Sequence, residues 1–233
     1  MLLFVTGTST DVGKTVVTSA IAALGLARGS VAVVKPGQTG EPDGGSGDLA
    51  EVVRLAGPAV TCHELVRYPS ALSPAAAARL DGRDPLDPAA LYDLVLGLRE
   101  DLVLVEGAGG LLVRYDEDGL TLADMARALR ARVLVVVGPG LGTLNHTALT
   151  LEAMAHRGID LEGLVLGSWP ADPGLAERSN LRDLEMLAAR PLLGALPVGA
   201  PGSPDFTAVA RESLAPQLGG TWDARAFRER WDP

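Results

Sequence analysis

The sequence predicts an α/β fold in which a mostly parallel, doubly wound sheet is flanked by helices on both faces. Short aliphatic runs recur along the 233 residues, and segments with helical spacing separate most of them. Strands that alternate with helices form βαβ units with right-handed crossovers, which build a parallel sheet. The composition agrees, because 47% of the residues are hydrophobic but only 4% are aromatic. Such aliphatic strands are typical of sheets buried on both faces.

Each predicted element follows from its residues. The predicted strands are the runs rich in Val or Leu at residues 2–6, 31–35, 102–106, 133–137, 164–166 and 192–196. Two helices show an apolar face, formed by Val16, Val17, Ala20, Ile21 and Leu24 in one and by Leu144, Ala148, Leu151 and Met154 in the other. Residues 37–47 and 199–205 are predicted loops, the first of them mobile. Ligands of open α/β sheets bind outside the carboxyl ends of the strands, so loops that follow strands are the candidate sites.

The domain organisation is predicted to be a single α/β domain over residues 1–233. The sequence has no internal repeat and no low-complexity linker that would separate a second domain. Residues 219–233 are a candidate C-terminal appendage. Trp231 lies four residues after Phe227, so one helical turn would place both against the body or against a neighbouring subunit.

Charge and cysteine content exclude several classes of protein. The formal net charge is −9 and the pI is about 4.8, which argues against nucleic-acid binding and against docking on anionic membranes. Cys62 is the only cysteine, so an internal disulfide framework and a multi-cysteine metal site are excluded. No apolar run is long enough to span a membrane, and a strand-like run begins at Leu2 where a signal peptide would have its basic region. We therefore expect a cytoplasmic protein.

The residues between Gly7 and Thr15 are typical of a phosphate-binding loop. They follow the first predicted strand and lead at once into an amphipathic helix, which is the context that such a loop requires. Glycine lets the backbone approach a phosphate, and the free N–H groups at the helix N-terminus favour an anion. Lys14 can reach the β- and γ-phosphates, and the Thr15 hydroxyl can ligate Mg²⁺. The spacing departs from the common pattern, because five residues rather than four separate Gly7 from Gly13.

Two acidic residues are candidate metal ligands. Glu106 ends the aliphatic strand at 102–106, and Asp48 follows the Gly-rich loop. A hydroxyl, two carboxylates and phosphate oxygens would suit Mg²⁺, so Thr15, Asp48 and Glu106 form the expected set. Two alternatives stay open: Glu106 could be a solvated acid, and Asp48 could be the N-cap of a helix over residues 49–55.

Two further segments point to the same edge of the sheet. Lys35 closes the second predicted strand, where it either faces the ligand or extends to solvent. Residues 138–146 follow the strand at 133–137 and open a helix, whose N-terminus suits a carboxylate or another anion. The three histidines form no metal triad in the sequence.

Together these motifs resemble the dethiobiotin synthetase family, a deviant branch of the P-loop NTPases. The likeness covers residues 2 to about 205, and its motifs occur in the order of the family. They are the loop at 4–15, Lys35-Pro36 with Thr39-Gly40, residues 105–110, Gly142 with Asn145-His146, and Leu192-Leu193-Gly194 with Leu196-Pro197.

The resemblance implies that the ureido ring of dethiobiotin is closed from 7,8-diaminopelargonic acid, CO₂ and ATP with Mg²⁺. It implies Lys14 and Lys35 as catalytic residues, and Thr39, Leu141, Gly142 and Asn145 as substrate-binding residues. The last three would be contributed by the second subunit of a homodimer. The implied ATP-binding residues are Asp11, Val12, Gly13, Lys14, Thr15, Val16, Asp48, Glu106, Gly107, Ala108, Gly109, Gly110, Gly167, Ser168, Pro197, Val198 and Gly199.

The sequence departs from the family pattern at two places. Where family members often carry an Asn that contacts adenine, this chain has Gly167 and Ser168, so backbone groups, Ser168 and the loop at 197–199 are left for base recognition. Some members carry a lysine where Gly140 stands, so the carboxylate site would depend on backbone donors.

Two other functions remain as alternatives. One is an amidoligase-type synthetase, such as a corrinoid a,c-diamide synthase domain, but this chain lacks the length and the nucleophilic cysteine of the accompanying glutaminase domain. The other is a partitioning-type ATPase. Those proteins commonly carry a second lysine early in the phosphate loop, where this chain has Thr8, Ser9 and Thr10.

Overall fold

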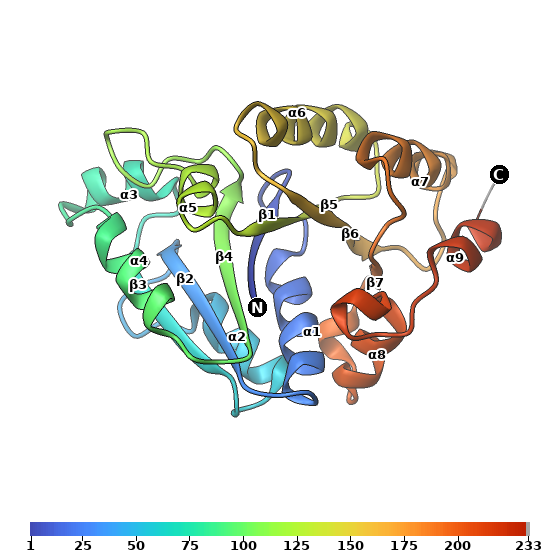
Figure 1. Cartoon of the computed structure of the whole chain (residues 1–233), viewed down its shortest axis with the longest axis horizontal. Coiled ribbons are helices and arrows are strands. Elements are labelled where there is room, and N and C mark those ends of the chain that lie inside the picture. The colour runs from blue at the N-terminus through green and yellow to red at the C-terminus, as the bar shows by residue number, and fades with distance from the viewer. Residues whose placement is uncertain (232–233) are drawn as a thin grey trace.

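The computed structural model describes residues 1–231, and the last two residues of the predicted domain lie outside this range. The fold is a seven-stranded sheet in which all paired strands are parallel, in the order β3-β2-β4-β1-β5-β6-β7 (Figure 1). The strands are β1 (Leu2–Gly7), β2 (Val31–Thr39), β3 (Thr61–Tyr68), β4 (Leu102–Gly110), β5 (Arg132–Val137), β6 (Leu161–Trp169) and β7 (Ala195–Pro197). The predicted parallel α/β fold is confirmed.

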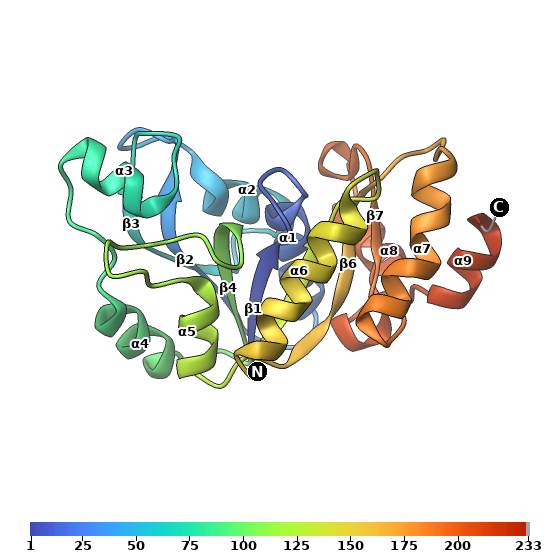
Figure 2. The same cartoon turned by 90° about the horizontal axis from the view of Figure 1, so that it is seen from above.

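Helices cover both faces of the sheet (Figures 1 and 2). One face carries α1 (Lys14–Leu26), α2 (Gly47–Ala56) and α8 (Phe206–Ser213). The other carries α4 (Pro88–Gly97), α5 (Leu122–Ala128), α6 (Thr143–His156) and α7 (Leu175–Ala188). The remaining helices are α3 (Pro74–Asp81), which packs on β2 and β3, the short η1 (Ala200–Gly202) and η2 (Pro216–Leu218), and α9 (Ala224–Trp231). Within residues 1–231, every helix is too short or too polar to cross a lipid bilayer.

The edge strand β3 is absent from the sequence prediction. Its residues include Thr61, His63, Glu64 and Arg67, and all but Tyr68 are exposed or half-buried. A strand with this exposure has no continuous aliphatic run, which is the signal that marks the other strands. Because Gly37 and Thr39 pair with Val66 and Tyr68 of β3, β2 extends to Thr39 instead of ending at Lys35.

Three other predicted boundaries were wrong. β4 continues to Gly110 beyond the predicted end at residue 106, and β6 runs from Leu161 to Trp169, so Gly167 and Ser168 lie within the strand. In contrast, β7 is confined to Ala195–Pro197. Buried residues extend from 192 to 196, but Leu192 and Leu193 precede the strand, so burial there does not reflect strand pairing.

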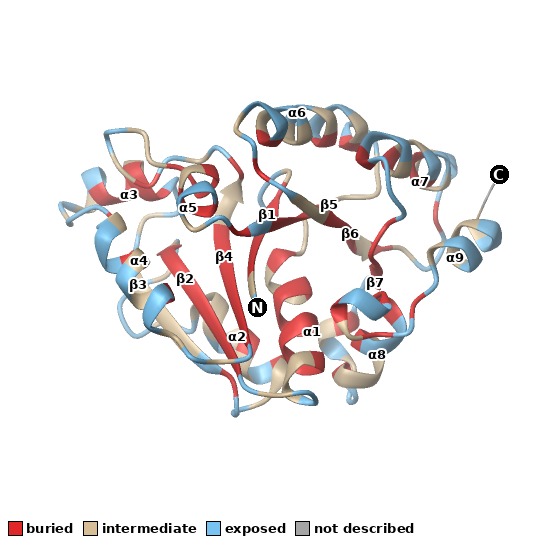
Figure 3. Cartoon of the chain, viewed as in Figure 1, coloured by how far each residue is buried: buried red, intermediate tan, exposed pale blue. Residues whose placement is uncertain are grey.

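The core consists of the aliphatic strands and the helix faces that cover them (Figure 3). In α1 the predicted face is buried except at Val16, which is half-buried. In α6 the buried residues are Thr143, Thr147 and Met154 rather than the predicted face, of which only Met154 is fully buried. The two threonines are polar, so hydrophobic periodicity does not detect the face that they share with Met154.

Aromatic contacts join the C-terminal helix to the sheet. The ring centroid of Phe227 lies 5.2 Å from that of Trp169 and 5.1 Å from that of Trp222. Trp231 lies 6.0 Å from Trp169, one helical turn after Phe227. These contacts place α9 against the body of the same chain, beside α7 (Figure 1).

Candidate functional site

The phosphate-binding loop connects β1 to α1 at the carboxyl edge of the sheet. Gly13 is the N-cap of α1 and adopts φ 95°, a left-handed conformation that favours glycine. The first helical residue is Lys14, whose Nζ donates to the Ser9 carbonyl at 3.0 Å across the loop. The helix N-terminus therefore faces the space enclosed by the loop, where its N–H groups favour an anion.

The loop rests directly on β6. A Cβ added to Gly167 would lie 1.9 Å from the Val12 carbonyl oxygen, and one added to Gly13 would lie 2.6 Å from the Gly167 carbonyl oxygen. No side chain fits at either position without moving backbone. Gly167 therefore lies behind the loop as a packing residue, and the lack of a side chain there has a steric reason.

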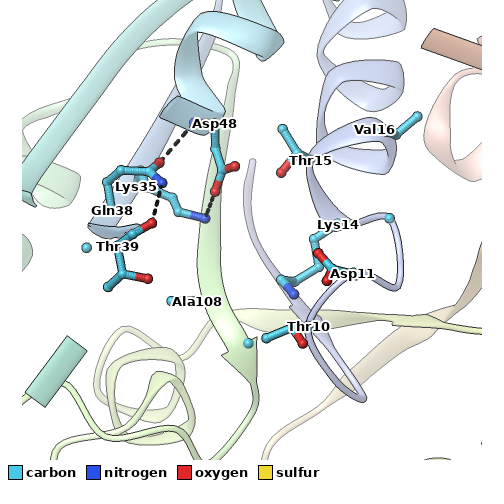
Figure 4. A pocket seen from close by; sticks show the side chains of 13 residues that line it. Thr10, Asp11, Lys14, Thr15, Val16, Lys35, Gln38, Thr39, Asp48 and Ala108 are labelled. Atoms are coloured by element: carbon cyan, nitrogen blue, oxygen red, sulfur yellow. Dashed lines mark hydrogen bonds and ion pairs between the residues drawn. The ribbon is translucent and has the colours of Figure 1, made fainter. Parts of the chain in front are cut away.

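An ionic cluster lies opposite the loop (Figure 4). Lys35 Nζ is 2.5 Å from Asp48 Oδ2 and 2.8 Å from Glu106 Oε1, and it also donates to the Gly107 carbonyl at 3.3 Å. The Thr15 hydroxyl donates to the same Glu106 oxygen at 3.0 Å. One lysine, two carboxylates and one hydroxyl thus meet here, from within β2 and β4 and from the first turns of α1 and α2. Glu106 is buried, which rules out the solvated acid that the sequence left open.

The two lysines have opposite electrostatic environments. Burial disfavours the charge of Lys35, but Glu106 and Asp48 outweigh this effect and raise its pKa above the usual value of lysine. Burial and the nearby charge of Lys35 lower the pKa of Lys14. Lys14 and Lys35 are the only two lysines of the chain, and its other basic residues are arginines and histidines. This restriction of lysine to two positions is visible in the sequence itself and marks both residues.

Asp48 is positioned by residues that the sequence analysis did not select. Helix α2 begins at Gly47 with Ser46 as N-cap, so the alternative of Asp48 as the N-cap was wrong. The Asp48 N–H donates to Gln38 Oε1 at 2.9 Å, and Gln38 Nε2 donates to the Thr39 carbonyl at 3.0 Å (Figure 4). Asp48 therefore lies in the first turn of α2 with its carboxylate directed to Lys35.

The residues present fit a magnesium ion. Glu106 Oε2 is buried and has no hydrogen-bond partner among residues 1–231. No group of three or more His, Cys, Asp and Glu side chains in that range could hold a metal by itself. Mg²⁺ is commonly held by one or two carboxylates together with substrate phosphates and water, so a set of Thr15, Asp48 and Glu106 beside a phosphate-binding loop suits it.

A cavity of about 410 Å³ opens between the loop and the ends of β2 and β4. The predicted residues that line it are Asp11, Gly13, Lys14, Thr15, Val16, Lys35, Thr39, Asp48, Ala108 and Gly109. Glu106 and Gly107 are buried beside it and contact Lys35. The other predicted ATP-binding residues do not line it: Val12, Gly110, Gly167, Ser168, Pro197, Val198 and Gly199.

The predicted carboxylate-binding turn lies away from this cavity. Leu141, Gly142 and Asn145 are exposed at the start of α6, and none of them lines the cavity. Asn180 of α7 is buried and its Nδ2 donates to the carbonyls of Pro139 and Gly140, at 2.8 and 3.2 Å. Asn180 thereby fixes the loop that leads into the turn, a role with no local sequence signal.

A second hollow adjoins the turn. It has a volume of about 450 Å³ and runs between the phosphate-binding loop, the end of β4 and α6. His146 and Leu149 of α6 line it on one side, and Gly110 and Leu112 line it on the other. Leu112 and Leu149 are 45% and 57% exposed, which gives this hollow an apolar surface open to solvent.

Comparison with known proteins shows the family. A family model described as an AAA domain matches residues 2–203. An ATP-dependent dethiobiotin synthetase from Frankia casuarinae is 60% identical over 235 residues, covering 99% of this chain and 98% of that protein. This chain belongs to the dethiobiotin synthetase family. A second member, from Parafrankia sp., is 58% identical over 99% of this chain and 98% of its own length.

Solved structures agree with the fold. The septum site-determining protein MinD of Pyrococcus horikoshii, determined in complex with Mg-ADP, superposes with a TM-score of 0.51. The match covers 98% of this chain and 94% of that chain, at 17% sequence identity. At this identity the likeness concerns the fold alone, which is that of the P-loop NTPases.

Proposed function

We propose that this protein closes the ureido ring of dethiobiotin from 7,8-diaminopelargonic acid, CO₂ and ATP. The observation that carries the proposal is the arrangement of Lys14 and Lys35 on one cavity, between the phosphate-binding loop and Glu106. Membership of the dethiobiotin synthetase family, at 60% identity over nearly the whole chain, supports it. The family membership favours neither a corrinoid diamide synthase nor a partitioning ATPase.

The reaction balances in three steps. One substrate amine attacks CO₂ and loses a proton, which gives a carbamate. A carbamate oxygen then attacks the γ-phosphorus of ATP, so ADP leaves and a carbamic-phosphoric anhydride forms. The second amine attacks the carbamoyl carbon and loses a proton, and the C–O bond to phosphate breaks with its electrons on phosphate as the ring closes. Each step adds or moves negative charge on oxygen, so fixed cations beside these oxygens favour it.

We assign the two cations to different parts of this charge. Lys14, in the phosphate-binding loop, contacts the β- and γ-phosphate oxygens of ATP. Lys35, within β2, contacts the carbamate oxygens on the other side of the cavity. Phosphoryl transfer depends mostly on positioning and on electrostatic stabilisation, which both lysines provide. Thr39 lines the same cavity beyond Lys35 and donates a hydrogen bond to the carbamate or to the diamine.

Magnesium is the proposed cofactor. Thr15, Asp48 and Glu106 would hold it beside the phosphates. When bound, it offsets the negative charge of the β- and γ-phosphates. Two observations support this assignment. Glu106 Oε2 has no hydrogen-bond partner within residues 1–231, and contacts with Glu106 or with their shared partner Lys35 hold the three side chains together.

The nucleoside end of ATP is assigned to the residues beyond the loop. Ser168 is half-buried near the end of β6, and the exposed residues 197–199 begin at the last residue of β7, at the same edge of the sheet. We assign base contacts to Ser168 and to the backbone of Pro197, Val198 and Gly199, and phosphate contacts to residues 107–110.

A homodimer is the proposed functional unit. Leu141, Gly142 and Asn145 are exposed and do not line the cavity of their own chain, so they are available to the substrate carboxylate of a second copy. The apolar hollow between Leu112 and Leu149 adjoins them and offers a surface for that copy. An isologous interface would then complete two equivalent sites.

Product formation tests the function directly. The wild-type protein is mixed with ATP, Mg²⁺, 7,8-diaminopelargonate and bicarbonate, and dethiobiotin is measured by mass spectrometry together with released phosphate. We expect equimolar dethiobiotin and phosphate, with release that requires both the diamine and bicarbonate. Lys14→Ala should abolish both products without changing the circular dichroism spectrum. Phosphate release by Lys14→Ala at the wild-type rate would exclude the assignment.

A further inference from the structure

The Gly-rich loop between β2 and α2 is held in place from β3. Residues 40–46 contain no helix or strand, and the sequence predicts a mobile loop here. Arg67 of β3 donates from Nη1 to the carbonyls of Gly45 and Pro42, at 3.0 and 3.3 Å. These two contacts fix a segment that has little side-chain packing of its own.

Arg67 is itself rigidly oriented. Its Nε and Nη2 each donate to a different oxygen of Glu64, both at 2.7 Å. The two side chains are 18% and 20% exposed, so water screens this bidentate pair only in part. Charge-assisted bidentate bonds add geometric specificity as well as energy. Glu64 thus directs the third nitrogen of the guanidinium toward the loop.

A second arginine supports the same loop from outside. Arg83 makes a bidentate pair with Asp43 at 2.7 Å and also donates to the Arg67 carbonyl at 3.1 Å. Asp43 is 69% exposed, so this outer pair is worth less than the inner contacts of Arg67.

The held loop ends at Ser46, two residues before Asp48. Gly47 has φ 53°, and a Cβ added to it would lie 3.0 Å from Arg67 Nη2 and 3.1 Å from Gln38 Oε1. The backbone at Gly47 is therefore packed between these two side chains. The next residue, Asp48, donates to Gln38 from its N–H and pairs with Lys35 through its carboxylate.

We propose that Arg67 is a positioning residue that sets the place of Asp48 beside Lys35 and the metal site. Gly-rich backbone has more conformations than other backbone, and ordering it costs conformational entropy. Arg67 restricts the loop before any ligand binds, so the free energy of ordering the loop does not weaken metal binding. The proposal rests on the proposed role of Asp48 as a metal ligand, and it adds a residue of the edge strand to the site.

Arg67→Lys is the decisive substitution, because lysine keeps the charge but cannot contact Glu64 and the loop carbonyls with one planar fork. Arg225→Lys is the matched control. Arg225 pairs with Glu229 at 2.7 Å, but its side chain is 80% exposed, and α9 lies on the opposite side of the molecule from β3 (Figure 1). Glu64→Gln is a second variant, since it leaves Arg67 in place but removes the charge that orients it.

Two measurements test the proposal. The first is amide hydrogen exchange of residues 41–48 in the protein without ligands. The second is the Mg²⁺ concentration that half-saturates ATP binding, followed by calorimetry. We expect exchange to become about tenfold faster in Arg67→Lys, because a hydrogen bond to a charged donor is lost. We expect the half-saturating Mg²⁺ concentration to rise about tenfold. This is the lower end of the decrease in metal affinity that follows loss of a residue orienting a metal ligand. Glu64→Gln should change both in the same direction and Arg225→Lys neither.

Each contrary outcome has one meaning. Unchanged exchange in Arg67→Lys would show that Arg67 does not hold the loop, and faster exchange with unchanged Mg²⁺ dependence would show that the loop does not place Asp48. Either result overturns the proposal. If Arg67→Lys fails to fold, the same criteria apply to Glu64→Gln. Failure of the wild-type protein to form dethiobiotin would overturn the proposed function instead, since neither measurement here requires turnover.

Discussion

The α-carbon of Gly167 on β6 lies against the Val12 carbonyl of the phosphate-binding loop, so closely that an added Cβ would stand 1.9 Å from that oxygen. In the reverse direction, a Cβ added to Gly13 would lie 2.6 Å from the Gly167 carbonyl oxygen. Both contacts involve backbone, which cannot rotate aside as a long side chain can. The conformation of the loop therefore depends on a strand that is remote in the sequence.

We expect Gly167→Ala to displace the loop and to weaken ATP binding by about tenfold or more, because small displacements of a binding group have large effects. Gly97→Ala is the control, since an added Cβ at Gly97 has no neighbour within 4 Å. Calorimetry of ATP binding to both variants measures the effect. Wild-type affinity in a folded Gly167→Ala protein would mean that the loop tolerates the shift.

Glu106→Gln should raise the Mg²⁺ requirement. Glu106 Oε1 contacts Thr15 and Lys35, and Oε2 has no partner within residues 1–231. Replacing the carboxylate therefore removes a proposed metal ligand and one of the two carboxylates that pair with Lys35. We expect the half-saturating Mg²⁺ concentration for dethiobiotin formation to rise by about tenfold or more. Glu152→Gln, an exposed substitution on α6, should leave it unchanged. An unaltered magnesium titration in Glu106→Gln would remove this residue from the metal site.

The pKa values of the two lysines predict a difference in chemical reactivity. An amine reacts with acetic anhydride only when deprotonated, and the pKa of Lys14 is lowered whereas that of Lys35 is raised. At a pH below 10, Lys14 should therefore be acetylated faster than Lys35, and its labelling midpoint should lie below 10.5. ATP should protect Lys14. Because the chain has no other lysine, peptide mass spectrometry measures both sites without interference.

The lowered pKa of Lys14 also sets the direction in which ATP affinity changes with pH. Protonated Lys14 attracts phosphate, so a lowered pKa means that ATP affinity falls on the alkaline side earlier than for an ordinary lysine. Equal labelling rates for the two lysines across the pH range would contradict the assigned environments.

Mixing two inactive variants tests the shared site. Lys14→Ala loses the proposed phosphate contact, and Asn145→Ala loses the side chain that we assign to the substrate of the second subunit. A mixed dimer contains one site with both residues intact, so activity should return to at most about a quarter of the wild-type level under random exchange. Subunit exchange is established separately with differently tagged copies. No recovery despite proven exchange would mean that each chain uses its own turn.

The sequence alone determined the fold class, most of the strands and the phosphate-binding loop, because each depends on local patterns. An aliphatic run that ends in Gly7 and leads to Lys14 and Thr15 has the same meaning in any α/β chain. Lys35 and Glu106 were also predictable, since the carboxyl ends of parallel strands meet at one edge of the sheet.

Only the tertiary structure decided which remote residues complete the site. β3 is half-exposed and lacks an aliphatic run. The sequence therefore contains no pattern that predicts this strand or the proposed role of Arg67. The contact of Gly167 with Val12 involves no side chain, and Asn180 acts through a loop that belongs to another element. Such contacts arise from the order of strands in the sheet and from the close approach of backbones, neither of which leaves a periodic signal in the sequence.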